Sequence, residues 1–279
     1  MNILGIDFED WYHPQLVQPY ITKEKKPTMF QGMDRILELL NKNETFATFF
    51  VVGELLYQNP ELLDKIIDNG HEVAFHTMHH DRLDSKNFSE KFDDELDEFD
   101  KLTDGKSKGF RAPTFSLNQD SSWVIEKLEK HDYVYDSSIV PVKTDLYGIP
   151  NAEIKPYRIS SNSIEKNDPN GKLIEFPLLV TKFLGKKLPA AGGFYLRTLP
   201  EKVIKNAISN YEKQNIPATF YIHSWELTPE FFPKIKLPRK ENFITFHNIE
   251  KAFQKMNKLI NEFEFTSFSK FLSKTSIFD

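Results

Sequence analysis

The segment FHTMHHD, residues 75–81, holds three of the eight histidines in this chain of 279 residues. Two of them, His76 and His80, are four positions apart, and on a helical turn this spacing places both imidazoles on one face. Such a pair can bind one divalent metal ion. The zinc-protease helix uses the same spacing with a glutamate after the first histidine, but Thr77 occupies that position here. A lone His-x3-His pair is a weak signal, and surface or core histidines are the alternative interpretation.

Carboxylates close the apolar stretch NILGIDF, residues 2–8, and follow it directly: Asp7, Glu9 and Asp10. A carboxylate at the end of this predicted strand can supply a third ligand beside two imidazoles. Two histidines and one carboxylate leave coordination positions open for water and substrate, as catalytic metal sites require. The chain has no cysteine, which excludes disulfides and zinc sites that contain cysteine.

Polar side chains also stand at the ends of later stretches with a strand-like pattern. Arg111 lies in KGFRAP, residues 108–113, and His223 and Glu226 lie near the end of ATFYIHSWEL, residues 218–227. A charged group inside a core is costly, and in α/β barrels the carboxyl ends of the strands form the rim that carries catalytic side chains. The sequence therefore predicts one shared pocket at that rim.

The elements that must position these residues alternate between strand and helix along the whole chain. Strands are predicted by short β-branched and aromatic runs at 2–8, 47–53, 71–77, 108–113, 133–139, 173–180 and 218–227. Helices are predicted by apolar residues at helical spacing at 33–41, 60–70, 87–105, 121–131, 201–215 and 248–263. This alternation indicates parallel βαβ units in an α/β fold. About seven strands favour a distorted (β/α)7 barrel over an open sheet.

No linker divides the chain, so we expect a single catalytic domain over residues 1–279. The stretch 141–172 is rich in Pro, Asn, Ser and Lys and interrupts the alternation. We expect it to be an excursion over the surface. Residues from about 228 to 279 are expected to form a C-terminal extension packed on the barrel.

Charge and hydropathy exclude several classes of partner. The chain has 36 basic and 41 acidic residues, a net charge of −5, and no strongly basic block, so no nucleic acid is expected. We find no apolar run of the roughly 18 residues that a membrane span needs and no signal-peptide pattern at the start. These absences favour a cytoplasmic location, and the oligomeric state is left open.

Five motifs in order resemble the polysaccharide deacetylase family, carbohydrate esterase family 4, which has the nodulation-protein homology domain. They are DFED (7–10), ATFFVVG (47–53), HTMHH (76–80), RAP (111–113) and IHSWE (222–226). Four later stretches, YDSSIVP, EFPLL, GGFYLR and IHSWEL, resemble a subgroup that has a C-terminal extension and is associated with exopolysaccharide genes. The resemblance covers nearly the whole chain and implies a barrel of the polysaccharide deacetylase type.

The resemblance assigns a role to each matching residue. It places the metal ligands at Asp10, His76 and His80. It places the catalytic base at Glu9, with Arg111 paired to that base, and the general acid at His223, with Asp136 of YDSS as the acid that supports it.

The first motif leaves the assignment of base and ligand open. Glu9 stands where the family usually has Asp. Asp7 lies two residues earlier and therefore on the same face of a strand as Glu9. Relatives with an Asp-x-Asp first motif align on Asp7 and Glu9 instead, which would shift base and ligand. Asp7 is therefore kept as a second candidate base.

Aromatic side chains near these motifs are candidates for a wall that stacks on sugar rings. The candidate substrate-binding residues are Trp11, Pro113, Phe194, Tyr195 and Trp225. Two of them belong to GGFYLR, residues 192–197, whose paired glycines before aromatic residues suggest a loop that closes on the site. Packing is the alternative role for aromatic residues at a barrel rim.

The implied activity is metal-dependent removal of N-acetyl groups from an amino-sugar-containing glycan or its precursor. A divalent ion, with zinc preferred over cobalt, nickel or iron, would activate a water molecule while a carboxylate base and a histidine acid move protons. Two alternatives remain: a cyclic imide or ureide amidohydrolase on the same fold, and a carbohydrate-binding homologue that has lost turnover.

Overall fold

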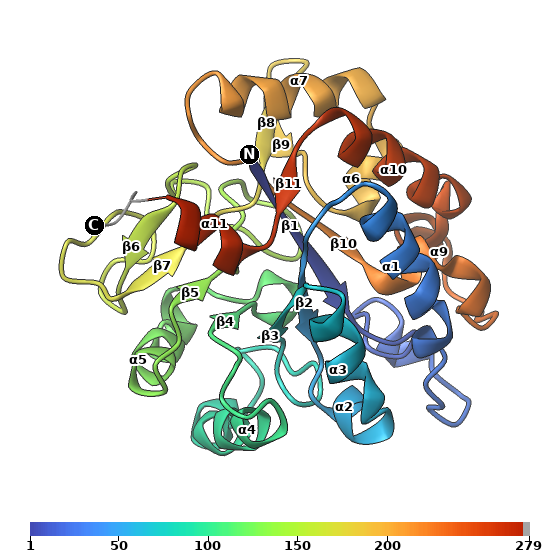
Figure 1. Cartoon of the computed structure of the whole chain (residues 1–279), viewed down its shortest axis with the longest axis horizontal. Coiled ribbons are helices and arrows are strands. Elements are labelled where there is room, and N and C mark those ends of the chain that lie inside the picture. Colours follow the sequence, from blue (N-terminus) through green and yellow to red (C-terminus); the bar gives the residue numbers. More distant parts are fainter. Residues whose placement is uncertain (276–279) are drawn as a thin grey trace.

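Seven parallel strands form the centre of the molecule within residues 1–275, the part of the chain that this computed structural model describes. In spatial order they are β10 (Thr219–His223), β1 (Asn2–Phe8), β2 (Thr48–Val51), β3 (Glu72–Phe75), β4 (Gly109–Phe110), β5 (Tyr135–Asp136) and β7 (Leu173–Glu175). An isolated parallel bridge between Leu178 and Thr219 connects the chain after β7 back to β10. The sheet therefore curls into a barrel (Figure 1), which confirms the predicted α/β class.

The central strand β1 is buried along its whole length. It pairs with β10 on one side and β2 on the other, and its first residues also pair with β11 (Phe265–Thr266). A strand with both faces covered needs apolar residues on both, which explains the continuous run NILGIDF. Because side chains alternate along a strand, Gly5 and Asp7 face the interior of the barrel, where Arg111 lies against both.

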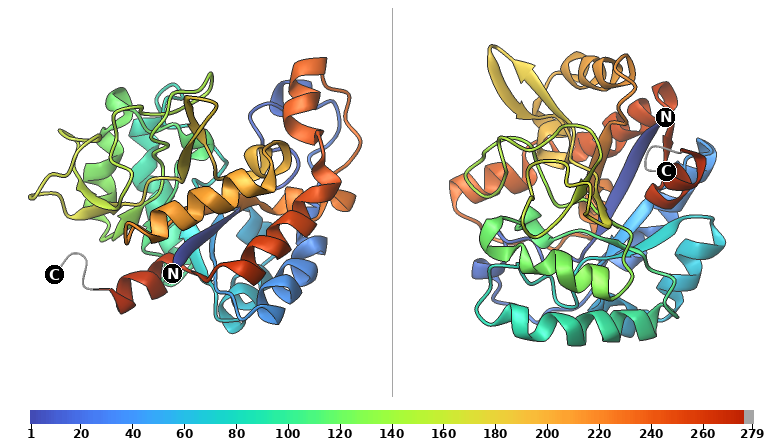
Figure 2. Two further views of the ribbon diagram at one scale, coloured as in Figure 1. Left: turned by 90° about the horizontal axis from the view of Figure 1, so that it is seen from above. Right: turned by 90° about the vertical axis from the view of Figure 1, so that its left-hand side faces the viewer.

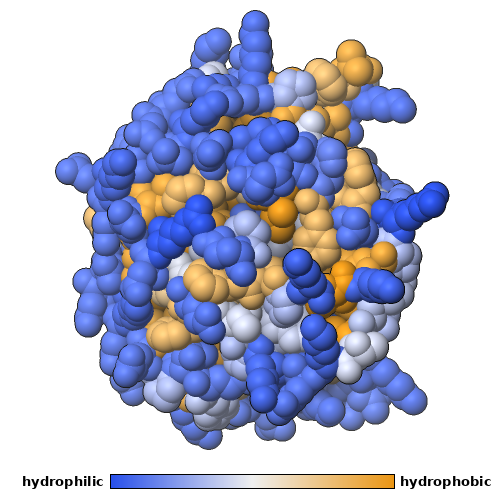
Figure 3. Space-filling view, turned by 90° about the vertical axis from the view of Figure 1, so that its right-hand side faces the viewer, coloured by the Kyte–Doolittle hydropathy of each residue, from blue (hydrophilic) through white to orange (hydrophobic). Residues whose placement is uncertain are grey.

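Amphipathic helices ring the sheet (Figure 1). They are α1 (Met33–Lys42), α2 (Glu54–Gln58), α3 (Glu61–Asp68), α4 (Phe88–Leu102), α5 (Trp123–Lys130), α7 (Glu201–Glu212) and α10 (Ala252–Glu262). Each buries one apolar face, as α1 does with Ile36, Leu37 and Leu40. The outer faces are polar: the side of the molecule in Figure 3 is mainly hydrophilic, with separate apolar patches.

The expected surface excursion, residues 141–172, is mostly irregular, but it contains β6 (Tyr157–Ile159), which pairs antiparallel with β7. After it, β8 (Val180–Phe183) and β9 (Lys186–Pro189) form a hairpin that projects from the body (Figure 2). The segment 192–197 is not a loop, because α6 spans Gly193–Thr198. Short helices α8 (Ser224–Leu227) and α9 (Arg239–Phe246) follow β10. Single 3-10 turns span Gln18–Tyr20, Met29–Gly32, Pro113–Phe115, Gln119–Ser121, Pro229–Phe231 and Ile249–Lys251.

The last helix, α11 (Phe268–Lys274), closes the end of the barrel that lies opposite the predicted pocket. Its backbone amide at Phe268 bonds to Thr48 at the start of β2, 3.0 Å away. The Phe268 ring stacks on Tyr135 with 4.7 Å between the ring centroids and packs against Phe50. The bottom of the barrel is therefore covered by α11, whereas a cavity opens at the carboxyl ends of the strands.

Within residues 1–275 the structure contains no helix that is both long and apolar enough to cross a bilayer.

Candidate metal and catalytic site

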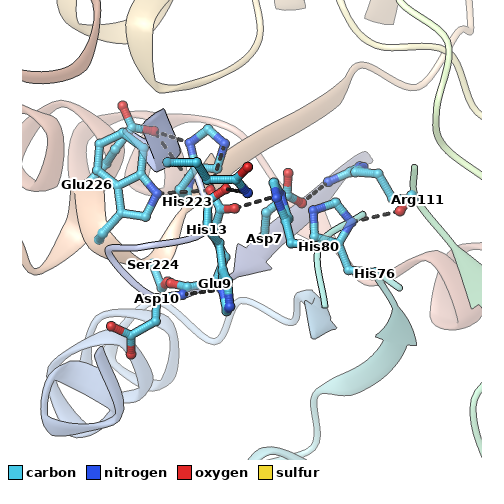
Figure 4. Close-up of polar contacts among 12 residues, drawn as sticks. Asp7, Glu9, Asp10, His13, His76, His80, Arg111, His223, Ser224 and Glu226 are labelled. Carbon is cyan, nitrogen blue, oxygen red and sulfur yellow. Dashed lines mark hydrogen bonds and ion pairs between the residues drawn. The ribbon is translucent and has the colours of Figure 1, made fainter. Parts of the chain in front are cut away.

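Most of the predicted polar residues meet at the carboxyl ends of the strands, where one cavity of about 670 Å³ is lined by Asp7, Glu9, His76, His80, His223 and Glu226. Asp7 and Glu9 come from the end of β1, His76 follows β3, Arg111 follows β4, and His223 ends β10. Figure 4 shows these side chains converging from separate strands. The predicted shared pocket is present.

Two histidines and a glutamate form the candidate metal site. Within residues 1–275, Glu9, His76 and His80 are a buried group whose potential ligand atoms all lie within 4.8 Å of one another. The Nδ1 atom of His76 lies 2.7 Å from the carbonyl oxygen of Arg111. That carbonyl can only accept a hydrogen bond, so Nδ1 carries the proton and Nε2 is left free as a ligand.

The polar atoms of this group lack the partners that buried groups normally have. Glu9 Oε2 and His80 Nδ1 have no hydrogen-bond partner of good geometry among the described residues, although Glu9 Oε2 lies 2.7 Å from His80 Nε2. Leaving such atoms unpaired is costly. Two imidazoles and one carboxylate are ligands that suit a divalent transition metal ion. The residues present therefore fit such an ion.

The loop 76–80 is not the helical turn that the spacing suggested. Thr77 and His80 have left-handed backbone conformations, with φ of 58° and 59°. A bond from the amide of Gly53 to the carbonyl of Thr77, 3.0 Å long, helps to hold the turn. The two imidazoles converge because of this turn, with ring centroids 5.0 Å apart. A left-handed β-branched residue is strained, and such strain clusters at functional sites.

Asp10, predicted as a ligand, lies apart from the histidine pair in this structure. Its Oδ1 accepts a bond from the Trp11 amide, and its Oδ2 accepts bonds from the Thr28 and Met29 amides at 2.9 and 3.0 Å. The carboxylate points away from the histidine pair (Figure 4), and burial raises the pKa of Asp10 to about 6. Asp10 follows the strand and lies one position out of phase with Asp7 and Glu9, so it ties down the next loop instead.

Arg111 pairs with Asp7 and not with Glu9. This corrects the expectation that Arg111 pairs with Glu9. The Nη1–Oδ1 distance is 2.5 Å, and the guanidinium also donates to the carbonyl and hydroxyl of Ser137, each at 3.0 Å. It lies 3.9 Å from the centre of the Phe50 ring. At Gly5 a Cβ would come within 2.6 Å of Nη1. The glycine on the central strand therefore leaves room for this buried arginine.

Glu9 uses one carboxylate oxygen in a hydrogen bond and directs the other at the histidine pair. Trp225 donates its indole N–H to Oε1 at 2.9 Å, and Oε2 faces His80. Burial alone would raise the pKa of Glu9, but His80 and His223 together hold it well below its usual range. The side chain is thus an ionised carboxylate with one oxygen free to bind a cation.

His223 is supported by Glu226, not by Asp136. Its Nδ1 lies 2.7 Å from Glu226 Oε2, and its Nε2 lies 3.5 Å from Glu9 Oε1. Asp136 is fully buried elsewhere and accepts a 2.5 Å hydrogen bond from Ser138. Burial lowers the pKa of His223, but the carboxylates of Glu9 and Glu226 outweigh it and raise the pKa to about 9. The sequence offered one signal for Glu226: an acid three residues after the histidine.

Three of the five candidate substrate residues line the cavity: Phe194, Tyr195 and Trp225. Trp11 does not, because its indole turns to the carbonyl of Lys26, 2.8 Å away. Pro113 does not either, because it begins a 3-10 turn whose next residues, Thr114 and Phe115, reach the cavity instead.

His13 packs against the ligand group, a role that the sequence motifs did not predict. Its Nε2 lies 2.9 Å from Glu54, and its ring stacks on His80 with centroids 5.7 Å apart. Glu54 also lies 2.9 Å from His79, the third histidine of the segment, whose side chain is 59% exposed. His79 therefore stands outside the ligand group, while His13 orients one of its members.

Comparison with known proteins gives two adjoining matches. Residues 20–133 match the family described as polysaccharide deacetylase, and residues 137–273 match a domain of unknown function, DUF3473. The chitooligosaccharide deacetylase of Bradyrhizobium sp. (strain ANU 289) is 41% identical over 64 residues, 23% of this chain and 29% of that protein. The peptidoglycan-N-acetylmuramic acid deacetylase PdaA of Bacillus subtilis (strain 168) is 30% identical over 87 residues, 28% of this chain and 33% of that protein.

These matches span a third or less of the two curated relatives. The fold match is much longer. A crystal structure of a candidate polysaccharide deacetylase from Mycobacterium smegmatis superimposes with a TM-score of 0.59 over 98% of this chain and 90% of that chain, at 14% identity. The likeness establishes a common fold.

Proposed function

We propose that this chain, in which residues 20–133 match the polysaccharide deacetylase family, removes N-acetyl groups from an amino-sugar-containing glycan or a precursor of one, by metal-dependent hydrolysis. One observation carries the proposal. The Glu9–His76–His80 group lies at the floor of the rim cavity, beside a second carboxylate and a histidine with a raised pKa. The two relatives are named as deacetylases of chitooligosaccharide and peptidoglycan, which supports this substrate class.

In this proposal Glu9, His76 and His80 hold the ion, and zinc is the preferred identity. The chain has no cysteine, and zinc sites of hydrolases commonly combine imidazoles with one carboxylate and an open position. When bound, the ion supplies a Lewis acid that activates a water molecule and polarises the acetyl carbonyl.

Asp7 is the proposed base. It lines the cavity on the same face of β1 as Glu9, and Arg111 fixes its orientation. Glu9 is the first candidate for the base from the sequence, but its Oε1 accepts a hydrogen bond from Trp225 and its Oε2 is directed at His80. A base must reach the proton that it removes, and Asp7 is the carboxylate left to do so.

His223 is the proposed proton donor. Its Nδ1 is held by Glu226, so Nε2 is the atom directed toward the cavity side of Glu9. Its raised pKa keeps the ring protonated at neutral pH. Expulsion of an amine from the tetrahedral intermediate needs a proton on nitrogen, and a positioned acid supplies it.

The substrate wall is proposed to consist of Phe194, Tyr195 and Trp225. Apolar faces of sugar rings pack well against aromatic side chains, which carry a large apolar area. Phe194 and Tyr195 stand at the mouth of the cavity on α6, while Trp225 stands beside Glu9. A bound sugar would therefore lie between α6 and the ion.

The test is metal analysis combined with acetate release from N-acetylated chitooligosaccharides and peptidoglycan fragments. We expect about one metal ion per chain and acetate release that is lost in His80→Ala. The matched control is His79→Ala, the neighbouring histidine outside the ligand group, which should keep both. Opening of a cyclic ureide without acetate release would support the amidohydrolase alternative. Sugar binding without turnover would identify an inactive homologue.

A further inference from the structure

A buried carboxylate and a buried guanidinium stand directly behind His223. Glu226 uses one oxygen for His223 Nδ1, at 2.7 Å, and the other for Arg197 Nε, at 2.9 Å. Both side chains are 1% exposed. Burying a charge pair is costly unless its hydrogen bonds are satisfied. Stability alone therefore does not explain why this ion pair is buried behind His223.

Arg197 also holds the wall of the cavity. Its Nη1 donates to the carbonyl of His247 at 2.5 Å, and its Nη2 donates to the carbonyl of Ile244 at 2.9 Å. These carbonyls belong to the end of α9 and the residue after it, where carbonyl groups lack partners within the helix. Ile244 lines the cavity. One guanidinium thus fixes both the support of the proton donor and a wall of the pocket.

Gly193 is required by the same arrangement. A Cβ at this position would lie 1.6 Å from Glu226 Oε2 and 1.8 Å from its Cδ. Any larger residue would displace the carboxylate from His223. The motif GGFYLR therefore supplies three things from one short segment: space for Glu226, a cation that binds it, and the aromatic residues of the substrate wall.

We propose that Glu226 and Arg197 are positioning residues for the proton donor, with Arg197 fixing Glu226 and Glu226 fixing the Nδ1-protonated tautomer of His223. His223, Glu226 and Arg197 all lie in the segment that matches a domain of unknown function, so that segment supplies both the proton donor and its support, while His76 and His80 lie in the segment that matches the deacetylases. This inference rests on the proposed function. It gives GGFYLR a role in the departure of the amine, not in metal binding or in the attack of water.

A proton donor matters in proportion to how poor the leaving group is. The amine of an N-acetyl sugar cannot leave without a proton, whereas 4-nitrophenolate leaves unaided. Loss of the acid should therefore slow deacetylation of an amino sugar and spare hydrolysis of 4-nitrophenyl acetate, while a general loss of structure would slow both. The ratio of the two activities separates a positioning role from a structural one.

The experiment compares Arg197→Met, Glu226→Gln and His223→Ala in the metal-loaded full chain. We expect each to lower kcat for an N-acetylated chitooligosaccharide by at least about tenfold and up to about 10⁴-fold, with metal content and hydrolysis of 4-nitrophenyl acetate within about threefold of the parent enzyme. KM should stay within the same range in Glu226→Gln and His223→Ala and should rise in Arg197→Met, which also loses the bonds to the cavity wall. Arg197→Met added to His223→Ala should cost nothing further, because residues that act as one unit are not additive. Arg197→Lys should restore part of the loss.

Arg35→Met is the matched control, since Arg35 forms an exposed ion pair with Glu230 on the surface and such pairs contribute little. Equal loss of ester and amide hydrolysis in folded Arg197→Met and Glu226→Gln, or losses that multiply with His223→Ala, would overturn the inference. If Arg197→Met does not fold, the ratio of amide to ester hydrolysis in Glu226→Gln tests the inference instead, because glutamine keeps the size of the side chain.

A failure of the proposed function is recognised separately. If the parent enzyme releases no acetate from any N-acetyl sugar, the proposed function falls, and nitrogen-15 NMR of the imidazoles decides the inference instead. We expect the His223 ring to carry its neutral-state proton on Nδ1 in the parent protein and to shift toward the other tautomer in Glu226→Gln. An unchanged tautomer would reject the positioning role.

Discussion

At the scale of single residues, the first motif shows how one position along a strand decides chemistry. Asp7 faces Arg111, Glu9 faces Trp225 and His80, and Asp10 accepts three backbone amides. All three are buried acids within four positions. Composition alone cannot rank them, because their roles depend on which cation or amide each one meets. The sequence predicted where the motif lies. Because side chains alternate along a strand, Asp7 and Glu9 share a face and Asp10 does not, which supports the alternative alignment on Asp7 and Glu9.

Substitution of these acids gives the first prediction. Glu9→Gln should lose the metal and activity together, because the amide cannot replace the charged ligand. Asp7→Asn should keep the metal and lose about 10²–10⁴-fold in kcat, the size of a missing general base. Asp10→Asn is the control in the same motif and should keep the metal. Metal content by mass spectrometry, measured beside acetate release, checks all three. Full metal content in Glu9→Gln would return the ligand role to another residue.

The pH dependence of His223 gives the second prediction. Its pKa is raised to about 9, against about 6.5 for an unperturbed histidine. A proton donor must be protonated, so kcat/KM should be sustained at neutral pH and fall as the pH rises through this range. Removal of the Glu226 charge in Glu226→Gln should move the alkaline limb to lower pH, because a carboxylate favours the imidazolium. The pH profile of kcat/KM for both proteins is the measurement. A limb that stays in place in Glu226→Gln would assign it to another group.

At the scale of elements, hydrophobic periodicity predicted the strands and helices of the barrel and failed for the segments around the cavity. The runs at 2–8 and 33–41 match β1 and α1 closely. The helix α6 was expected to be a loop, because two glycines precede it, and tertiary contacts with Glu226 override that local signal. The turn at Thr77 and His80 depends on left-handed backbone angles that side-chain spacing does not encode.

The seal formed by α11 gives the third prediction. Phe268 is fully buried among Tyr135, Phe50 and Phe176. Phe268→Ala should lower the free energy of unfolding by about 3–5 kcal/mol, the usual cost of emptying a buried phenylalanine site. The control is Leu184→Ala at the tip of the β8–β9 hairpin, where the side chain is 86% exposed. Urea denaturation measures both. A change below about 1 kcal/mol in Phe268→Ala would mean that the end of the barrel does not depend on this helix.

At the scale of the whole molecule, the two matched segments share one sheet and one site. The strand β1 lies before both segments, and its neighbours β2 and β10 come from different ones. The site draws on all three parts: Asp7 and Glu9 from β1, the histidine pair and Arg111 from residues 20–133, and His223 from residues 137–273. A shared sheet and a shared site support the single domain predicted from the sequence, which stays a prediction.

The fourth prediction is that residues 1–136 do not fold without residues 137–279. In such a fragment β1 loses its pairing with β10 and β11, and β5 loses β7. Both edges of the remaining sheet would then expose unpaired backbone groups, which favours aggregation. The apolar interior that α11 covers would face water as well.

We expect the full chain to melt in one cooperative transition and the fragment to show neither a cooperative melt by circular dichroism nor metal binding at His76 and His80. Co-expression of both pieces should restore a soluble complex that binds metal, since the broken connection lies in a loop after β5. A fragment that melts cooperatively and binds one metal ion on its own would show that the second segment is dispensable for folding, and the shared-sheet account would then have to be abandoned.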